Sequence, residues 1–551
     1  MIGVISKDCE IGAVKEFFEL FKTHWEPFVR NQDYELVITT TGEVPAGLNA
    51  RLVAVYGSRS FKIDHQLGLE VQTTSQGGRL EYDGTEFPLY GAKSTFQHTG
   101  TSFLLDKDAG EVVGCEVRKP EACFVRVGYD LFQEISVLLS KGQPPEYAST
   151  PTTEMHISIL RSIMTRAGLP FVEVLPAPSG YDFVACLTHD VDFVGIREHK
   201  FDWTMLGFLY RALVVSFVMA VKGTLSWSRC WTNWQAAFSL PLVFVGLKDD
   251  FWLEFDRYME IEKGLGSTFF FIPFKDEPGT LRSSPAPKRR AAKYDLGTIK
   301  GEIAELLGNG CEVGLHGVDA WQDSEKAKRE RDRICEVTGQ AEVGVRMHWL
   351  YFDEESPSAL EGAGLRYDST LGYNDAVGFR AGTAQVFGIP STKGLLELPL
   401  CIQDTALFYP DRMNLSESDA MASCRHLIRQ VAKYGGVLTL NWHTRSLSPE
   451  RLWREFYERL INEMHASQVW FCTAGQAVNW FQSRRALRFE SSPLVGQGLC
   501  VVSDIYAETL PQFCIRVYQP ASLPLRESGF VDIPWNGQTE LTFPRTQHSE
   551  A

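Results

Sequence analysis

The sequence has no C-x-x-C pair among its 12 cysteines. A chain of 551 residues can bury a large core without disulfides, so these cysteines are expected to be reduced, small core residues. The N-terminus has no basic segment followed by an apolar one of signal-peptide length, which predicts a cytoplasmic protein. Positive charge is scarce, because 54 Lys and Arg stand against 69 Asp and Glu. The resulting formal net charge of −15 argues against a general nucleic-acid-binding protein.

One long segment of this acidic chain, residues 203–248, has no Asp or Glu. Its apolar run, 212–221, is too short to span a membrane, which takes about 20 apolar residues. Two interpretations stay open: a helical hairpin buried against the rest of the protein, or a basic, Trp-rich helix lying peripherally on an anionic membrane. The basic and tryptophan residues of the segment are Arg211, Lys222, Arg229 and Lys248, and Trp203, Trp227, Trp231 and Trp234.

The length predicts several domains. Residues 1–150 mix strand-like and helical patterns and predict an N-terminal α/β domain of unknown role. Residues 151–485 alternate apolar strands with helical patterns, which is typical of repeated βα units and favours a barrel over an open sheet. Residues 486–551 predict a small C-terminal all-β domain. The strands predicted from 151 onward are 183–187, 267–273, 311–315, 343–346, 395–400, 437–442, 469–473, 499–502, 513–518 and 539–543.

The most informative strand ends in two carboxylates, Asp190 and Asp192. Side chains at such a strand end project into the cleft where parallel α/β folds keep their sites. Neighbouring acids repel each other unless a cation or a shared proton compensates, so the pair indicates a metal site or proton transfer. A helix N-cap or a turn acid pair is the alternative.

Further candidate residues lie at or near the ends of the later predicted strands: His316, Arg346, His348, Trp349, Leu440 and His443. With Asp190 and Asp192 they make the chain resemble the polysaccharide deacetylase family, metal-dependent carbohydrate esterases built on a distorted (β/α)7 barrel. The resemblance covers residues 180–480 and includes an insertion near 195–250.

The resemblance implies a role for each matching residue. Asp190 would be the catalytic base, with Arg346 orienting it, and His443 would be the acid. Asp192 would bind the metal, as in the part of the family that spaces its two aspartates as D-x-D. Amide hydrolysis needs such a set, because a water must lose a proton and the departing nitrogen must gain one.

Substrate contacts are predicted less sharply. By resemblance, the backbone N–H of Trp349 would help to bind the oxyanion, and Leu440 would line an acetyl pocket. Asp368 is a candidate for orienting His443 or for capping a turn. Arg380 and Asp404 are candidates for sugar contacts, with surface or turn roles as the alternative.

The metal ligands depart from the family pattern. His316 matches the first histidine of an H-x-x-x-H motif, whose two imidazoles share one helix face, but Ala320 stands at the second position. Asp319 and His348 are equal candidates for the missing ligand. His189 is a weaker one, because neighbours along a strand point to opposite faces. The set suits zinc, although another divalent ion stays open.

These features predict a metal-dependent hydrolase that removes an N-acyl group, expected to be acetyl, from a sugar. The substrate would be a polysaccharide or a lipid- or nucleotide-linked glycan precursor, met in the cytoplasm or at the inner membrane face. One alternative, motivated by Ala320, is a metal-free barrel that binds glycans or partner proteins in envelope polysaccharide assembly. Another is hydrolysis of a non-sugar C–N bond, since a barrel does not fix its substrate.

Overall fold

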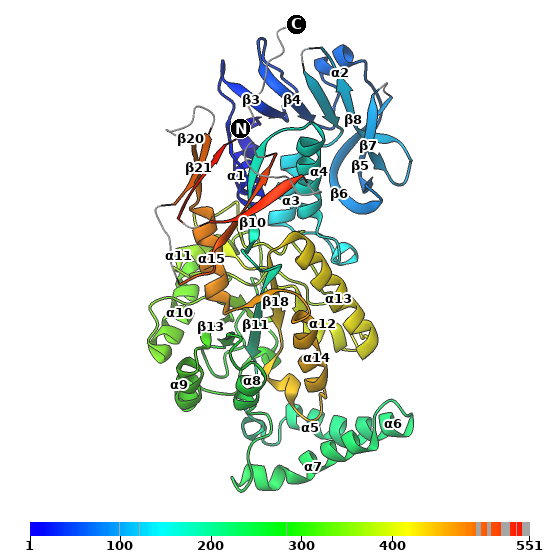
Figure 1. Cartoon of the computed structure of the whole chain (residues 1–551). Coiled ribbons are helices and arrows are strands. Elements are labelled where there is room, and N and C mark those ends of the chain that lie inside the picture. The colour runs from blue at the N-terminus through cyan, green and yellow to red at the C-terminus, as the bar shows by residue number, and fades with distance from the viewer. Residues whose placement is uncertain are drawn as a thin grey trace.

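The chain builds an N-terminal sheet, a central parallel sheet and small C-terminal sheets (Figure 1). The computed structural model describes residues 1–97, 100–120, 122–282, 284–491, 498–503, 509–519, 529–535 and 537–542. The N-terminal sheet and a projecting helical hairpin lie at opposite ends of the molecule, with the central sheet between them.

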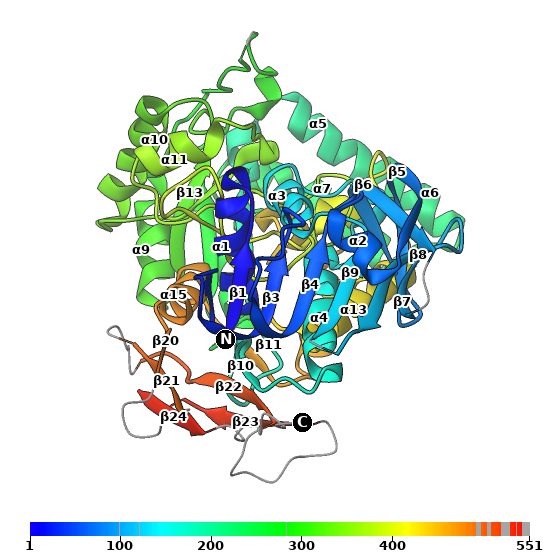
Figure 2. The same cartoon turned by 90° about the horizontal axis from the view of Figure 1, so that it is seen from above.

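The N-terminal sheet has nine strands in the order β2-β1-β3-β4-β9-β8-β7-β5-β6. Its first five strands pair in parallel, and the others pair antiparallel, so the sheet is mixed. Figure 2 shows α1 (Ile11–Phe21) lying against this sheet. The strands are β1 (Ile2–Ile5), β2 (Trp25–Pro27), β3 (Asp33–Thr39), β4 (Asn49–Tyr56), β5 (Glu70–Tyr82), β6 (Thr85–Gln97), β7 (Thr101–Asp106), β8 (Val112–Arg118) and β9 (Cys123–Val127); α2 (Lys62–Leu67) and α3 (Leu131–Ser140) complete the region.

The central sheet is parallel and follows the order β14-β13-β12-β11-β18-β17, with β19 paired to β11. Strands β11, β12 and β18 are buried on both faces, which explains why they are continuous apolar runs in the sequence. The strands are β11 (Phe183–Val191), β12 (Ser267–Phe271), β13 (Glu312–Gly317), β14 (Val345–Met347), β17 (Ile402–Gln403), β18 (Val437–Asn441) and β19 (Val469–Phe471).

This sheet curls but does not reproduce the predicted barrel in full. The pairing path of the described strands ends at β14 and β17, so a closed (β/α)7 ring is not confirmed. Isolated parallel bridges from Val345 to Asp368 and from Asp368 to Glu397 extend the sheet beyond β14 toward β15 (Phe387–Gly388) and β16 (Leu396–Glu397). The helices of this region are α8 (Phe255–Ile261), α9 (Lys300–Gly308), α10 (Ser324–Thr338), α11 (Ser356–Gly362), α12 (Asp404–Phe408), α13 (Glu417–Tyr434), α14 (Arg454–Met464) and α15 (Ala474–Arg485).

The C-terminal strands pair with a segment that precedes the central sheet. After α4 (Thr152–Arg166), strand β10 (Phe171–Pro178) pairs antiparallel with β22, far along the chain. The predicted domain boundary at residue 485 therefore falls between β10 and β22, which belong to the same sheet. These strands are β20 (Arg488–Ser491), β21 (Gly498–Val502), β22 (Phe513–Tyr518), β23 (Phe530–Pro534) and β24 (Gln538–Thr542); the last residue of the predicted strand 539–543 lies outside the described residues.

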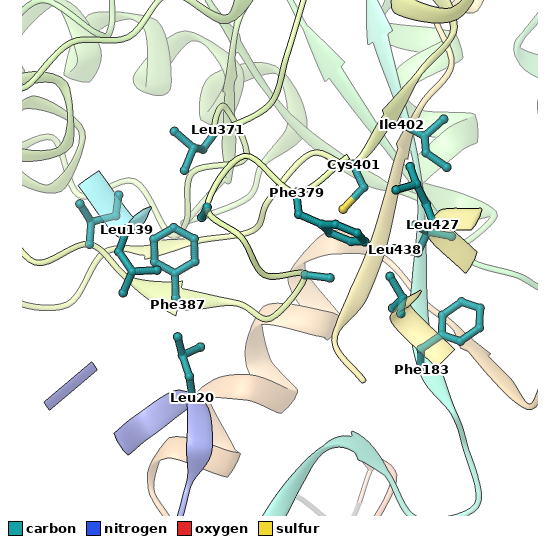
Figure 3. Packing of buried hydrophobic residues seen from close by; sticks show 14 of the residues in the cluster. Leu20, Leu139, Phe183, Leu371, Phe379, Phe387, Cys401, Ile402, Leu427 and Leu438 are labelled. Carbon is teal, nitrogen blue, oxygen red and sulfur yellow. The ribbon is translucent and has the colours of Figure 1, made fainter. Parts of the chain in front are cut away.

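One hydrophobic core joins the N-terminal region to the central sheet. Leu20 of α1 and Leu139 of α3 belong to the same buried cluster as Phe183, Phe387 and Leu438 (Figure 3). Burial of this much apolar surface holds the N-terminal sheet to the central one.

A buried arginine adds hydrogen bonds to that junction. Arg484 of α15 donates to the backbone carbonyls of Glu19 and Leu20 in α1 and of Val174 and Leu175 in β10, over 2.7–3.1 Å. Its neighbour on the chain, Arg485, instead forms an ion pair with Glu16 at 2.7 Å.

The acid-free segment forms a helical hairpin between β11 and β12. Its first arm is α5 (Trp203–Leu209), a π-helical turn (Tyr210–Val215) and α6 (Ser216–Val221), and its second arm is α7 (Trp227–Phe244). The hairpin interpretation matches this geometry, but the outer face is exposed rather than buried against the body.

Candidate functional site

The carboxyl ends of the parallel strands bring the residues of the predicted constellation together. Thr188 of β11 is in register with Asn441 of β18, and His316 of β13 is in register with Arg346 of β14. Parallel strands end at one common edge, so the residues at these ends meet there.

Three side chains form a compact cluster at this edge: Asp192, His316 and His348. The Oδ1 of Asp192 lies 3.3 Å from Nε2 of His316 and 3.2 Å from Nδ1 of His348. The two imidazole nitrogens are 3.0 Å apart. Both rings are buried, whereas the Asp192 side chain is 20% exposed, so the cluster opens to solvent at the carboxylate.

The chemistry of this cluster fits a divalent cation. The Nδ1 of His316 is 2.9 Å from the backbone carbonyl of Arg346, to which it donates, so its Nε2 presents a lone pair to the cluster. The Oδ1 of Asp192 is buried and has no hydrogen-bond partner. Two imidazoles and a carboxylate are donors that zinc and other divalent transition metals accept.

Electrostatics keeps these donors in their binding forms. Burial alone would raise the pKa of Asp192, but His348 and His316 outweigh burial and hold it well below the usual range. Burial lowers the pKa of His348 and favours the neutral imidazole, against the opposing effect of Asp192.

Asp190 lies beside the cluster in a fixed orientation. Its Oδ1 accepts a hydrogen bond from Nη1 of Arg346 at 3.1 Å, and its Oδ2 accepts one from Nδ2 of Asn441 at 2.7 Å. The Oδ2 also lies 3.9 Å from Nε2 of His316. Burial would raise the pKa of Asp190, but His316, Arg346 and His443 together lower it. The side chain is therefore held as a carboxylate facing the cluster.

Several contacts hold the Arg346 side chain in place beside Asp190. It is fully buried, and it also donates to the hydroxyl of Thr188 at 2.6 Å and to the backbone carbonyl of Ser369 at 3.0 Å. Its guanidinium lies over the ring of Phe270. Sequence reasoning assigned Arg346 to orient Asp190, and it missed Asn441, whose only signal was its position two residues before His443.

His443 also lies next to the cluster. Its Nε2 is 3.9 Å from Oδ2 of Asp192, and its Nδ1 is 2.7 Å from Oδ1 of Asp404. The other oxygen of Asp404 accepts the backbone N–H of His443 at 2.8 Å and the hydroxyl of Ser446. Burial opposes protonation, but Asp404, followed by Asp192 and Asp190, raises the pKa of His443 to about 10.

Asp404 therefore orients His443, a role for which the sequence had suggested Asp368. Asp404 is fully buried and was predicted only to contact sugar or a turn. The parallel pairing of β17 with β18 explains its place, because Gln403 is in register with Asn441 and the next residues of both strands leave the same edge.

Trp349 follows His348 in a strained turn. Its φ is 64° and that of Leu350 is 54°, a left-handed conformation that costs bulky residues about 1 kcal/mol or more each. Arg290 supports this turn, since its buried guanidinium donates to the backbone carbonyls of His348 at 3.1 Å and Val318 at 2.7 Å.

Two of the alternative ligands lie outside the cluster. Asp319 accepts hydrogen bonds from the backbone N–H of Thr280 and from Gln322. His189 points to the opposite face of β11, where it contacts the carbonyl of Trp442 and the carboxylate of Glu262.

The helical H-x-x-x-H geometry does not occur at this site. His316 lies in strand β13, and Ala320 lies in the turn that follows, so the two do not share a helix face. His348 supplies the second imidazole from the neighbouring strand end instead.

The other residues predicted to contact substrate have partners of their own within the protein or are buried. Asp368 is fully buried and accepts a hydrogen bond from Thr370; burial raises its pKa to about 6. Leu440 is buried on the face of β18 opposite Asn441, because neighbouring strand residues alternate. Arg380 donates to the carbonyl of Gly372 at 2.8 Å and packs against Gly142.

Comparison with known proteins gives structural neighbours only. No family model matches the chain, and no curated protein matches it. Agd3, described as a novel carbohydrate deacetylase, covers 98% of this chain and 98% of its own at 8% identity and a TM-score of 0.38. A Mycobacterium smegmatis protein described as a polysaccharide deacetylase covers 57% of this chain and 96% of its own at 19% identity and a TM-score of 0.35.

A further neighbour is the polysaccharide deacetylase Bc1974 from Bacillus cereus, which covers 41% of this chain and 86% of its own at 11% identity and a TM-score of 0.24. The structural neighbours therefore include carbohydrate and polysaccharide deacetylases. At TM-scores this low, the likeness fixes neither the substrate nor the reaction.

Proposed function

We propose that the chain is a metal-dependent hydrolase that removes an acetyl group from the nitrogen of an amino sugar. The observation that carries this proposal is the placement of Asp190 and His443 next to the cluster of Asp192, His316 and His348, each 3.9 Å from an atom of the cluster. Amide hydrolysis needs a base for the attacking water and an acid for the departing nitrogen, and these two residues can supply them.

Asp190 acts as the base. Arg346 and Asn441 hold its two oxygens and favour the carboxylate form, so it can accept a proton from a water placed at the cluster. The substrate carbonyl would be bound between this water and the backbone N–H of Trp349, which follows His348 directly.

His443 acts as the acid. Asp404 fixes its Nδ1 as a donor, which turns Nε2 toward the cluster and the departing nitrogen. Proton transfer from Nε2 to that nitrogen completes cleavage of the C–N bond and leaves a free amine on the sugar.

Asp192, His316 and His348 would hold the cation. When bound, a divalent ion polarises the carbonyl of the substrate and lowers the pKa of a coordinated water. Zinc suits this donor set.

The substrate follows from the resemblance and the open carboxylate side of the cluster. We propose an N-acetylated glycan, as polymer or as lipid- or nucleotide-linked precursor. The alternative of a metal-free binding protein was motivated by Ala320, which stands where the family has its second histidine. His348 provides an imidazole to the cluster instead, so Ala320 no longer favours that alternative.

Acetate release from N-acetylhexosamine oligosaccharides, with and without added divalent metal, tests this proposal. Asp190→Asn is expected to lower the rate by about a thousandfold or more. Asp182→Asn, on the exposed start of the same strand segment, should keep the full rate. Normal turnover by Asp190→Asn would refute the assignment of the base, and turnover of cyclic amides but not of acetylated sugars would refute the substrate class.

A further inference from the structure

The helical hairpin between β11 and β12 has one face with no partner in the described structure. Its two arms bury small and apolar residues against each other, including Phe208, Ala212, Ala237 and Leu240. This inner face accounts for the fold of the hairpin. It leaves the outer face of both arms to be explained.

The outer face is a continuous apolar surface. Along the first arm the exposed side chains recur at helical spacing, so they form one stripe, and only 28% of an 18-residue window in this arm is buried. A second stripe runs along α7, and the two meet where Phe217 contacts Trp227. The exposed residues are Trp203, Leu206, Tyr210, Val214, Phe217, Val218, Met219 and Val221 on the first arm, and Trp227, Trp231, Phe238 and Leu242 on α7.

Such exposure is concentrated on this element. Elsewhere in the described part of the chain, the exposed large apolar side chains are Ile11, Val29, Tyr181, Phe201, Val245, Leu247 and Leu253, and the last four flank the two arms of the hairpin. A large contiguous apolar patch on a protein surface marks an interaction site.

The charges of the hairpin favour a negatively charged partner. Arg229 is turned to the body, where it pairs with Glu455. Lys222 and Lys248 are exposed at the tip and at the root, and residues 203–248 contain no carboxylate that would repel an anionic surface. Exposed Trp and Tyr side chains, apolar neighbours and two exposed lysines match the interface of a bilayer with anionic headgroups.

The root of the hairpin is tied to both catalytic loops. Phe193 follows Asp192, and its backbone carbonyl accepts a hydrogen bond from the hydroxyl of Thr444, next to His443, at 3.0 Å. The guanidinium of Arg445 lies over the rings of Phe193 and of Trp252 at the returning end of the hairpin. A hairpin lying on a membrane would therefore hold the opening of the site close to that membrane.

We propose that residues 203–248 form a peripheral docking element that lies flat in the interface of an anionic lipid bilayer. The first arm, Trp203–Val221, is long and apolar enough to cross a membrane by length and composition. It packs against α7, however, and both ends of the hairpin return to the body. Buried Asn233 and half-buried Arg229 of α7 also disfavour crossing the bilayer. The proposal does not depend on the reaction that the site catalyses.

Flotation of the full-length protein with phosphatidylcholine vesicles that contain phosphatidylglycerol tests it. The triple variant Trp203→Gln, Trp231→Gln and Phe238→Gln should lower the membrane partition coefficient about tenfold or more. The matched control, Ile11→Gln, Val29→Gln and Tyr181→Gln, removes exposed apolar side chains elsewhere and should float like the wild type. The wild type should bind vesicles of pure phosphatidylcholine more weakly than the anionic vesicles. The double variant Lys222→Gln, Lys248→Gln should bind the anionic vesicles more weakly than the wild type, and its binding should depend less on the salt concentration.

Circular dichroism identifies any variant that fails to fold, and single substitutions at the same three positions then replace the triple variant. Wild-type protein that stays with the unbound fraction would overturn the proposal, as would a triple variant that floats normally. A wild-type dimer that the triple variant dissociates, without vesicle binding, would instead make this face an interface between two copies of the chain and would also overturn it.

Discussion

Nδ1 of His348 lies 3.0 Å from Nε2 of His316, and both nitrogens face Oδ1 of Asp192. Two imidazole lone pairs at this distance repel each other unless a proton or a cation lies between them. A proton can join only one pair of these atoms, whereas a cation can satisfy all three. The relationship also explains how a chain with alanine at position 320 can keep two histidine ligands.

Metal content tests this relationship directly. His348→Ala should lower the affinity for zinc by at least about a hundredfold, since even partners that only support a ligand contribute about 10- to 100-fold. Titration of apoprotein with zinc, followed by elemental analysis, measures the change. Asp319→Asn is the matched control, because Asp319 bonds Thr280 and Gln322 outside the cluster and its loss should leave the affinity unchanged. Equal metal loss in the two variants would contradict the assignment of His348.

Asp404 should matter for rate and not for metal binding. Asp404→Asn replaces the acceptor of the His443 Nδ1 proton and should lower kcat by about a thousandfold, with KM and zinc content near wild type. Asp368→Asn tests the residue that the sequence analysis offered for this role. Asp368 is buried and bonds Thr370, so its amide variant should keep most of the activity. The opposite ranking of the two variants would show that His443 is not oriented as the structure indicates.

The sequence located the central strands and the residues at their ends because buried parallel strands are continuous apolar runs that stop at polar residues. The resemblance to the polysaccharide deacetylase family then assigned expected roles to Asp190, Asp192, His316, Arg346 and His443 at these strand ends. The role of Asp404 was not predicted, since it depends on the pairing of β17 with β18, which no local pattern encodes.

Two larger features also escaped local reasoning. The pairing of β10 with β22 joins segments more than 300 residues apart, and the sequence of neither strand indicates which strand it pairs with. The composition of residues 203–248 predicted either a buried helical hairpin or a helix on a membrane surface, but composition cannot tell whether an apolar helix face is covered. The structure shows that it is exposed.

The N-terminal region should lose stability as pH rises. Burial raises the pKa of Glu134 to about 7, while the backbone N–H groups of Tyr90 and Gly91 donate to its carboxyl group. The pKa of Glu134 in the folded protein is above its unfolded value of about 4.3, so the folded state binds the proton more tightly than the unfolded state. The resulting contribution to stability is fully present below about pH 4.3 and is lost as the pH rises from there to about 7. We expect the free energy of unfolding to fall by up to about 3 kcal/mol over this window.

Urea unfolding at a series of pH values measures this effect. Glu134→Gln cannot ionise, so its stability should depend less on pH than that of the wild type. Glu146→Gln, an exposed glutamate of the same region, should leave the pH dependence as it is. Identical curves for Glu134→Gln and the wild type would mean that this carboxyl does not titrate in the folded protein.

The junction between the N-terminal region and the central sheet should depend on Arg484 more than on Arg485. Arg484→Met removes the donors to four carbonyls of α1 and β10 and leaves buried acceptors unpaired, at an expected cost of about 3 kcal/mol or more. Arg485→Met breaks one ion pair with Glu16 at the edge of the junction and should cost about 1 kcal/mol. Urea unfolding compares the two. Equal losses would show that the buried hydrogen bonds of Arg484 contribute no more to stability than the partly exposed ion pair of Arg485.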